Sequence, residues 1–350
     1  MKNLFDYATK ELSQDAFLRW LFENYNCENE SVKNACRKLF DSFTNNDKFK
    51  DKTITELKTV SQWKNIDISV WFTVEEKDYL IVIEDKTRSD EHHQLTTYNE
   101  KIAKHCEWLI DNKKRPIENV YKIFYKTSKI SNDEHDRISA AGWNEPKIFD
   151  IYEIYELFKD CQNSGSEILD GYAQHIRDIY DYYENYMELD FKEDWLWNNT
   201  AFEAYATKLK QELEKGDFNV NVGCYRGMYV YMGVRRNFGR FTTELLFEFR
   251  HWEIVAKIIY WTNNNELSQA ELKKHMRDIN LPLNDDEKAI FKRGTAYGSK
   301  RLAQSLKLPD SDTPDNKFFE TRNEFTEWVY QCIEEYEEIL SKISIHLGCT

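Results

Sequence analysis

Residues 64–98, KNIDISVWFTVEEKDYLIVIEDKTRSDEHHQLTTY, contain the pattern that decides the fold. Apolar and polar residues alternate over 65–74, which predicts a strand with one face in the core. After a polar turn at 75–78, residues 79–83 are continuously apolar, as expected for a central strand that is covered on both faces. The two runs therefore predict a β-hairpin inside a larger sheet.

The second strand ends in three charged residues, Glu84, Asp85 and Lys86. Side chains alternate along a strand, so Glu84 and Lys86 point to one side and Asp85 points to the other. In a hairpin, Asp67 lies near Glu84, and two adjacent carboxylates repel each other unless a cation lies between them. Two carboxylates with water suit Mg²⁺, with Mn²⁺ as the other candidate. Lys86 is then placed to assist a water molecule or to neutralise developing charge.

This arrangement resembles the PD-(D/E)XK nuclease superfamily, in which an Asp is followed by a hairpin and by Glu-x-Lys at the end of an apolar strand. Ile66 stands where the proline of the family's name would be. Residues 94–98, QLTTY, resemble the Q-x-x-x-Y helix motif of the RecB-like branch. The resemblance covers about residues 8–150. An alternative is that Glu84, Asp85 and Lys86 form an ordinary solvated strand end.

The resemblance implies a role for six residues. It makes Asp67, Glu84, Lys86 and Gln94 catalytic, and it places Tyr98 near the nucleic-acid backbone. It also implies a third acid from the first helix, and Glu11 in ELSQDAFLRWL is the matching position. Ser13 is a plausible N-cap of that helix, so Glu11 precedes or begins it. The alternative for Glu11 is a capping or surface acid.

The order of expected elements agrees with the resemblance. Strands are expected at 53–60, 65–74, 79–83, 119–125 and 147–151. One helix is expected to begin near Ser13, and further helices are expected at 31–43, 90–112 and 131–142. The predicted fold class is α/β, with a restriction-endonuclease-like αβββαβ core and a mixed sheet. Helices then follow, and after them a C-terminal α+β domain with an antiparallel meander.

The second half has a different pattern from the first. Residues 152–215 are expected to be helical, residues 217–262 to form about four antiparallel strands, and residues 266–280 and 316–345 to form helices. We therefore expect a nuclease-like domain at 1–160, a helical connector at 161–215 and a C-terminal domain at 216–350. The last is a candidate substrate-binding or sensor module.

Charge is distributed unevenly along the chain. The net charge is −14, yet residues 221–310 carry 15 Lys and Arg against 10 Asp and Glu, a net of +5, which leaves −19 for the remainder. A basic segment in an acidic chain is a candidate nucleic-acid contact. The arginines at its expected turns are Arg226, Arg235, Arg236 and Arg240. The alternatives are solvated surface, or pairing with the acidic half or with a second subunit in a homodimer.

Several classes of protein are excluded or disfavoured by composition. No apolar run approaches the length of a membrane span, so no membrane partner is expected. None of the seven cysteines forms C-x-x-C, which disfavours zinc and iron–sulfur sites and predicts a reducing cytoplasm. The phosphate-binding G-x-x-x-x-G-K-[ST] motif is absent, which disfavours an ATPase.

The sequence therefore predicts a Mg²⁺-dependent phosphodiesterase. DNA is expected as the substrate, with cleavage as an endonuclease in a restriction or phage-defence setting by analogy only. One alternative is an RNA-cleaving nuclease with the same site. Another is a non-catalytic module that binds nucleic acid or protein.

Overall fold

The computed structural model describes residues 3–6, 11–44, 49, 52–89, 94–105, 107–110, 113–141, 147–189, 199–215, 218–225, 229–238, 241–250, 253–262, 291–292, 296–297, 301–306 and 321–347. The chain divides into two compact units, Met1–Glu184 and Asn185–Thr350. The segment expected to connect two domains is shared between them. Helix α6 (Glu167–Asn185) belongs almost wholly to the first unit, and α7 (Asn199–Glu214) belongs to the second.

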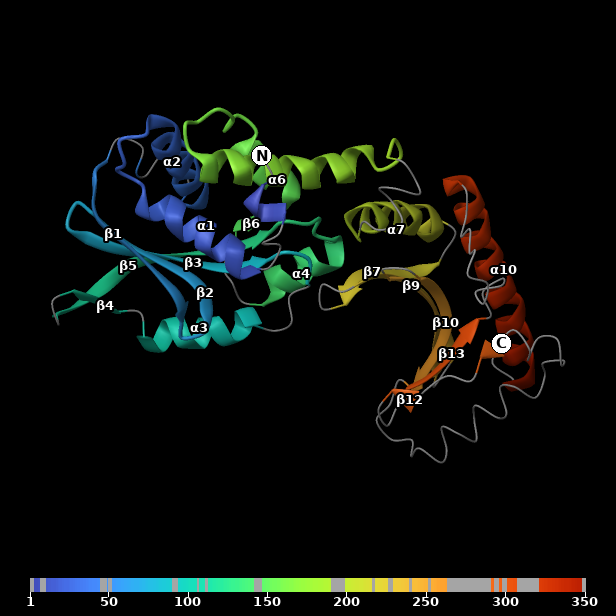
Figure 1. Cartoon of the computed structure of the whole chain (residues 1–350). Coiled ribbons are helices and arrows are strands. Elements are labelled where there is room, and N and C mark those ends of the chain that lie inside the picture. Colours follow the sequence, from blue (N-terminus) through green and yellow to red (C-terminus); the bar gives the residue numbers. More distant parts are fainter. Residues whose placement is uncertain are drawn as a thin grey trace. The chain divides into compact units, whose positions relative to one another are not determined.

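The described strands of the first unit form one mixed sheet (Figure 1). They are β1 (Ile54–Trp63), β2 (Ile66–Val74), β3 (Lys77–Lys86), β4 (Glu107–Ile110), β5 (Lys113–Lys126) and β6 (Lys147–Phe149). The order is β1-β2-β3-β5-β4, and β6 also pairs with β5. Hairpins β1–β2 and β2–β3 are antiparallel, whereas β3 and β5 are parallel. This sheet confirms the expected fold class.

Two tight turns set the register of the central hairpins. Lys64 and Asn65 connect β1 to β2 with φ of 54° and 62°, and Glu75 and Glu76 connect β2 to β3 with φ of 50° and 63°. Positive φ at both central residues is typical of the two-residue turn whose twist matches that of antiparallel strands. The second turn is shorter than the expected 75–78, and β3 begins at Lys77.

The helix expected at 90–112 ends at His105, and the prediction is wrong for residues 107–110. Helix α3 spans Gln94–His105, and residues 107–110 form strand β4. Leu109 follows Ile102 by the same seven residues that separate Ile102 from Leu95, so the sequence continues a helical pattern. The chain instead pairs β4 with the first four residues of β5, a fourteen-residue strand that is longer than the expected 119–125.

Helices cover both faces of this sheet. On one face lie α1 (Glu11–Glu23), α2 (Glu30–Thr44) and α6, and on the other lies α3 (Figure 1). Helix α5 (Ile151–Phe158) packs against α1, because the rings of Phe158 and Phe17 lie 5.7 Å apart. Phe72 of β2 faces α2, because its ring lies 4.8 Å from that of Phe40. Trp71, the next residue back, packs in the cluster under α3. These two residues point to opposite faces, as the alternation predicts. The expectation of a single core face is wrong, because both faces of β2 are buried and Ile66 lies in the same cluster as Trp71.

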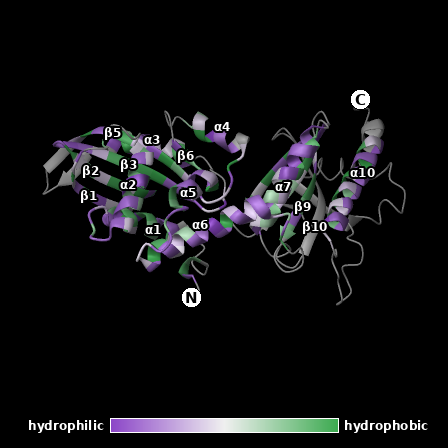
Figure 2. Ribbon diagram, turned by 90° about the horizontal axis from the view of Figure 1, so that it is seen from above, coloured by the Kyte–Doolittle hydropathy of each residue, from purple (hydrophilic) through white to green (hydrophobic). Residues whose placement is uncertain are grey.

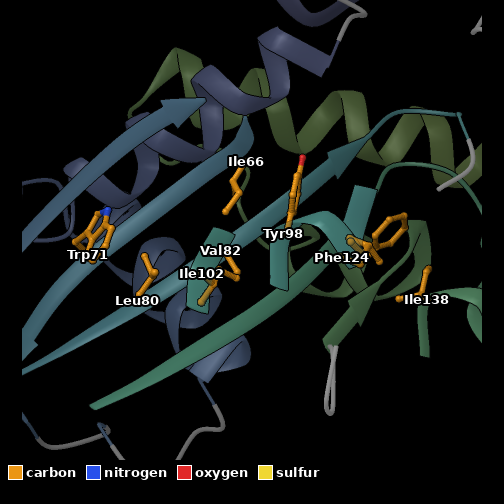
Figure 3. Close-up of a cluster of buried hydrophobic side chains, with 9 residues drawn as sticks. Ile66, Trp71, Leu80, Val82, Tyr98, Ile102, Phe124 and Ile138 are labelled. Carbon is orange, nitrogen blue, oxygen red and sulfur yellow. The ribbon is translucent and has the colours of Figure 1, made fainter. Parts of the chain in front are cut away.

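The cluster under α3 is the apolar floor of the site (Figure 3). Its buried members are Ile66, Trp71, Leu80, Val82, Leu95, Tyr98, Ile102, Phe124 and Ile138. They come from β2, β3, β5, α3 and α4 (Asn132–Ala140). Each fully buried aliphatic or aromatic side chain contributes about 1.5–3 kcal/mol, so this cluster fixes α3 against the sheet.

The start of helix α1 agrees with one of the two positions expected for Glu11, but the expected N-cap is wrong. It starts at Glu11, so Ser13 lies inside the first turn and is not the N-cap. Gln14 and Asp15 are both buried, and their contacts with the sheet need a helix that has already formed at these positions. Helix α6 carries both hydrophilic and hydrophobic residues (Figure 2), and its buried residues repeat at helical spacing.

The second unit is built on an antiparallel sheet of order β11-β13-β10-β9-β8-β7, with β12 paired to β13. Its meander confirms the strands expected at 217–262, and consists of β7 (Asn219–Tyr225), β8 (Tyr229–Phe238), β9 (Phe241–Arg250) and β10 (Glu253–Thr262). The remaining strands are β11 (Phe291–Lys292), β12 (Ala296–Tyr297) and β13 (Arg301–Leu306).

Helix α10 (Arg322–Leu347) occupies the second of the two helical segments expected near the C-terminus, whereas residues 266–280 lie outside the described residues. The ring of Phe202 in α7 stacks on Phe249 of β9 at 4.7 Å, and Phe325 of α10 contacts both rings. Both helices are thus anchored on the meander. In the part of the chain that the structure describes, no helix has the length and apolar character needed to cross a membrane.

Candidate active site

The candidate site forms where β2 begins and β3 ends. The last paired residues of this hairpin are Ile68 and Ile83, so the strands separate beyond them. Asp67 occupies the gap, and its Oδ2 accepts a hydrogen bond from the main-chain nitrogen of Asp85 at 3.1 Å. Its Oδ1 accepts from Nε2 of Gln62 at 3.2 Å. The Asp67 carboxylate is therefore held at the strand ends by groups on both neighbouring strands.

Glu84 and Lys86 form an ion pair at the end of β3. The Lys86 Nζ lies 2.5 Å from Oε1 of Glu84, and the two side chains are 7% and 0% exposed. Their shared direction agrees with the strand alternation predicted from the sequence. Buried charges need a partner of opposite sign, and each of these two residues provides it for the other.

Glu84 is an acid whose charge is disfavoured by its surroundings. Burial raises its pKa to about 8, and the nearby Asp67 adds to the increase, whereas Lys86 and the hydroxyl group of Tyr98 oppose it. The charge of Asp67 is therefore close enough to act on the carboxyl group of Glu84. Additional positive charge at this position would stabilise both carboxylates.

Helix α3 brings Tyr98 close to Glu84, and Gln94 begins the same helix. Gln94 is the first residue of α3 and is half-buried, and Tyr98 follows one turn later with an exposed fraction of 2%. Figure 3 shows the Tyr98 ring among the apolar side chains, with the hydroxyl oxygen at its outer end. Burial and then the charge of Glu84 raise the pKa of Tyr98, so the hydroxyl group keeps its proton and can donate to that carboxylate.

Asp85 points to the opposite side of β3, as the alternation predicts. It contacts Gln14 of α1, whose Nε2 donates to Asp85 Oδ1. Burial raises the pKa of Asp85, and the adjacent carboxyl group of Asp15 adds to this effect. Sequence reasoning did not identify Gln14 or Asp15. The nearest signal was their place in the helix that carries Glu11.

A family model described as the PD-(D/E)XK nuclease superfamily matches residues 2–181, which is just over half of the 350 residues. The chain belongs to this superfamily. The match extends through almost all of the first unit, and it includes each of the site residues on β2, β3 and α3. No curated protein and no solved structure matches the chain.

PD-(D/E)XK enzymes are nucleases that typically use a divalent metal, and the site residues of this chain fit such an ion. Asp67 and Glu84 supply hard carboxylate oxygens, and the raised pKa of Glu84 indicates a position that a cation would stabilise. Among the described residues, no group of three or more Asp, Glu, His and Cys side chains is arranged for a metal. Two carboxylates are sufficient for Mg²⁺, because it usually keeps several waters and also binds substrate phosphates.

Glu11, the expected third acid, is the first residue of α1, but its side chain lies outside what the structure describes. The arginines expected to bind nucleic acid are also only partly described. Arg226 and Arg240 lie outside the described residues, whereas Arg235 and Arg236 lie on β8. Arg235 Nε is 2.9 Å from Glu244 Oε1, and Arg236 Nε is 3.0 Å from Glu337 Oε1. These two contacts favour a structural role for Arg235 and Arg236.

Proposed function

We propose that this protein is a Mg²⁺-dependent nuclease that hydrolyses phosphodiester bonds of DNA. The observation that carries the proposal is the buried pair of Glu84 and Lys86 beside Asp67, at the end of a central strand of a PD-(D/E)XK sheet. A buried ion pair is a poor source of stability compared with apolar packing. Its presence at a strand end therefore supports a chemical role.

Each residue of the site has a proposed task. Asp67 and Glu84 hold Mg²⁺, with Mn²⁺ as an alternative and Glu11 as a further candidate ligand. When bound, the ion supplies Lewis-acid polarisation of the phosphate and lowers the pKa of a water molecule. Lys86 donates hydrogen bonds to the attacking water or to the phosphate oxygens, where its fixed positive charge stabilises the negative charge that develops in the transition state.

The residues of α3 support this arrangement. The proposed task of Tyr98 is to donate to Glu84, an interaction that lowers the pKa of this carboxyl group and so favours its charged form. The proposed task of Gln94, which lies one turn before Tyr98 and is half-buried, is to orient the substrate or Lys86. Contact of Tyr98 with the nucleic-acid backbone stays a prediction. The exposed fraction of Tyr98 is 2%, which leaves little of the residue accessible to a nucleic acid.

Cleavage of RNA is the second candidate function, because none of the proposed catalytic roles depends on the presence or absence of the 2′-hydroxyl group. The test is to incubate purified protein with covalently closed circular DNA, linear DNA and RNA, each with Mg²⁺, Mn²⁺ or EDTA. Metal-dependent nicking of the circle supports the endonuclease proposal. Cleavage of RNA alone changes the substrate, and absence of cleavage in every mixture overturns the proposed function in favour of a binding module.

The cellular setting is proposed by analogy alone. A nuclease core joined to a separate C-terminal unit is consistent with restriction or phage defence in the cytoplasm. The measurement is phage plating efficiency on cells that express the wild type or Asp67→Ala. Equal plating on both would contradict a defence role. The oligomeric state, with a homodimer as the candidate, follows from light scattering.

A further inference from the structure

Gln14 of α1 makes three hydrogen bonds with the two strands that meet beneath the site. Its Nε2 donates to Oδ1 of Asp85 and, at 3.5 Å, to the main-chain oxygen of Lys86. Its Oε1 accepts from the hydroxyl group of Thr127 at 3.0 Å. Both hydrogens and the oxygen of one amide are thereby used, and the side chain is 6% exposed.

These contacts lie at the last residues of the β3–β5 pair. Lys86 is in register with Lys126 at the end of this parallel pairing. One residue further, the main-chain nitrogen of Thr127 donates to the Lys86 oxygen at 3.0 Å. The Lys86 carbonyl group thus accepts from Thr127, just past the end of β5, and from Gln14 of α1. Gln14 joins these strands at the point where Lys86 projects toward the opposite face.

We propose that Gln14 is a positioning residue for Lys86, held in place by Thr127; this inference rests on the proposed function of Lys86. Gln14 fixes the carbonyl group of Lys86 and the side chain of the residue before it. Together these contacts fix the main-chain direction from which the lysine side chain leaves the strand. The ammonium group then stays on Glu84, ready for the phosphate.

The competing interpretation is that Gln14 is only a brace between α1 and the sheet. Removal of a purely structural contact lowers the stability of the fold, and it affects all steps of the reaction in a similar way. A positioning residue acts through Lys86, so its removal changes the lysine specifically. Small displacements of a reacting group reduce rate by about 100-fold without loss of the fold.

The first experiment is a set of matched variants in the full chain. Gln14→Met keeps the length of the side chain and removes its three hydrogen bonds, and we expect kcat to fall about 100-fold with KM unchanged. Thr127→Val, which lacks the hydroxyl group, should reduce kcat about tenfold, and Thr127→Ser should restore it. In a Lys86→Ala background, Gln14→Met should have no further effect.

The control is Thr73→Val at the other end of the same hairpin. Thr73 and Thr127 are both 4% exposed, and Thr73 donates its hydroxyl hydrogen to Asp78 at 2.6 Å. This variant loses a comparable buried hydrogen bond far from the strand ends, so it reports general loosening. Equal losses of kcat in Thr73→Val and Thr127→Val, or additive effects of Gln14→Met and Lys86→Ala, would overturn the proposal.

The second experiment needs no catalytic activity. The metal-free protein is treated with acetic anhydride, and acetylation of Lys86 is followed by peptide mass spectrometry relative to Lys77. The two side chains are 7% and 56% exposed, so wild-type Lys86 should react slowly. We expect Gln14→Met and Thr127→Val to increase the relative rate several-fold, and Thr127→Ser and Thr73→Val to leave it unchanged.

The two experiments separate the inference from the function on which it rests. If the wild type cleaves no nucleic acid, the proposed function fails, while the acetylation rates still show whether Gln14 holds Lys86. If the wild type cleaves but Gln14→Met acetylates at the wild-type rate and keeps its kcat, the positioning role is wrong and the nuclease proposal stands.

Discussion

Lys86 and the two carboxylates beside it have different expected roles, and single substitutions separate them. Asp67→Ala and Glu84→Ala should abolish metal-dependent cleavage together with binding of Mn²⁺, because each removes a proposed ligand. Lys86→Ala should retain Mn²⁺ binding and lose about 10²–10³ in kcat, the usual effect of removing one charge-stabilising donor. Calorimetric titration with Mn²⁺ and single-turnover cleavage provide the two measurements. Near-normal kcat in Lys86→Ala would contradict its assignment.

Tyr98→Phe tests whether the hydroxyl group acts on Glu84 or on nucleic acid. The ring is buried and is retained in the variant, so folding should be little affected. Loss of the hydroxyl donor makes the ionised form of Glu84 less favourable relative to its protonated form. We therefore expect the Mg²⁺ concentration for half-maximal cleavage to rise several-fold, with KM for nucleic acid unchanged. The opposite result, an unchanged Mg²⁺ requirement with weaker substrate binding, would establish the direct backbone contact that the family motif implies.

At this scale, the sequence predicted residues that lie on one hairpin and one helix turn. Strand alternation predicted the shared direction of Glu84 and Lys86, and the hairpin predicted that Asp67 lies near Glu84. Gln94 and Tyr98 were named by the resemblance to the Q-x-x-x-Y motif. Gln14 was not predictable in this way, because its partners Asp85 and Thr127 are 71 and 113 residues distant in the chain. No local period relates such positions.

Helix α5 has an N-cap whose charge makes stability depend on pH. Asp150 Oδ1 accepts from the Tyr152 main-chain nitrogen at 2.8 Å, and Glu153 Oε2 accepts from that of Asp150 at 3.0 Å. Burial and the Glu153 carboxyl group raise the pKa of Asp150 from 3.8 to about 7. The folded protein therefore binds more protons than the unfolded chain between these values, and this group's contribution to stability is lost as the pH rises from about 3.8 to about 7.

Asp150→Asn should remove this contribution. Asparagine caps helices as well as aspartate does and does not titrate. The free energy of unfolding, measured by urea titration at several pH values from 4 to 8, should fall less steeply with pH in the variant than in the wild type. Glu156→Gln is the control, because Glu156 lies on the same helix and pairs with Lys159 on the surface. Identical slopes for the wild type and Asp150→Asn would show that the cap does not titrate in this range.

The Arg236 side chain links β8 to α10 in the second unit. It pairs with Glu337 at 3.0 Å, and its guanidinium carbon lies 4.2 Å from the centre of the Phe218 ring. Arg236→Ala should lower stability by about 1 kcal/mol, since both contacts are partly exposed. Nucleic-acid affinity and its salt dependence should stay unchanged, as measured by fluorescence anisotropy in Ca²⁺. Glu337→Gln should destabilise similarly, and a weaker affinity in Arg236→Ala alone would indicate a phosphate contact.

The elements themselves were predictable where one period dominated. The strands at 65–74 and 79–83 and the meander at 217–262 have clear patterns, and the structure contains them. The end of α3 was not predictable, because Leu109 satisfies the helical period while its backbone pairs with β5. Strand pairing of this kind depends on a partner that the local pattern does not include.

On the scale of the whole molecule, the charge distribution has to be reconciled with an anionic substrate. The net charge is −14, so non-specific attraction to a polyanion is weak, and binding depends on the few places where positive charge collects. The net charge of +5 in residues 221–310 makes the second unit the candidate for this contact. Since Arg235 and Arg236 have acidic partners within that unit, Arg226 and Arg240 are the stronger candidates for phosphate binding.

The last prediction follows from this distribution. Each phosphate contact releases counterions and contributes about 0.9 to the slope of log affinity against log salt on duplex DNA. Arg226→Ala with Arg240→Ala should therefore weaken binding and reduce the slope by about two units, whereas Arg235→Ala should lower the melting temperature and leave the slope unchanged. Anisotropy titrations in Ca²⁺ across a series of salt concentrations measure both. An unchanged slope in the double variant would move the substrate contact away from these turns and make the second unit a sensor or an interface.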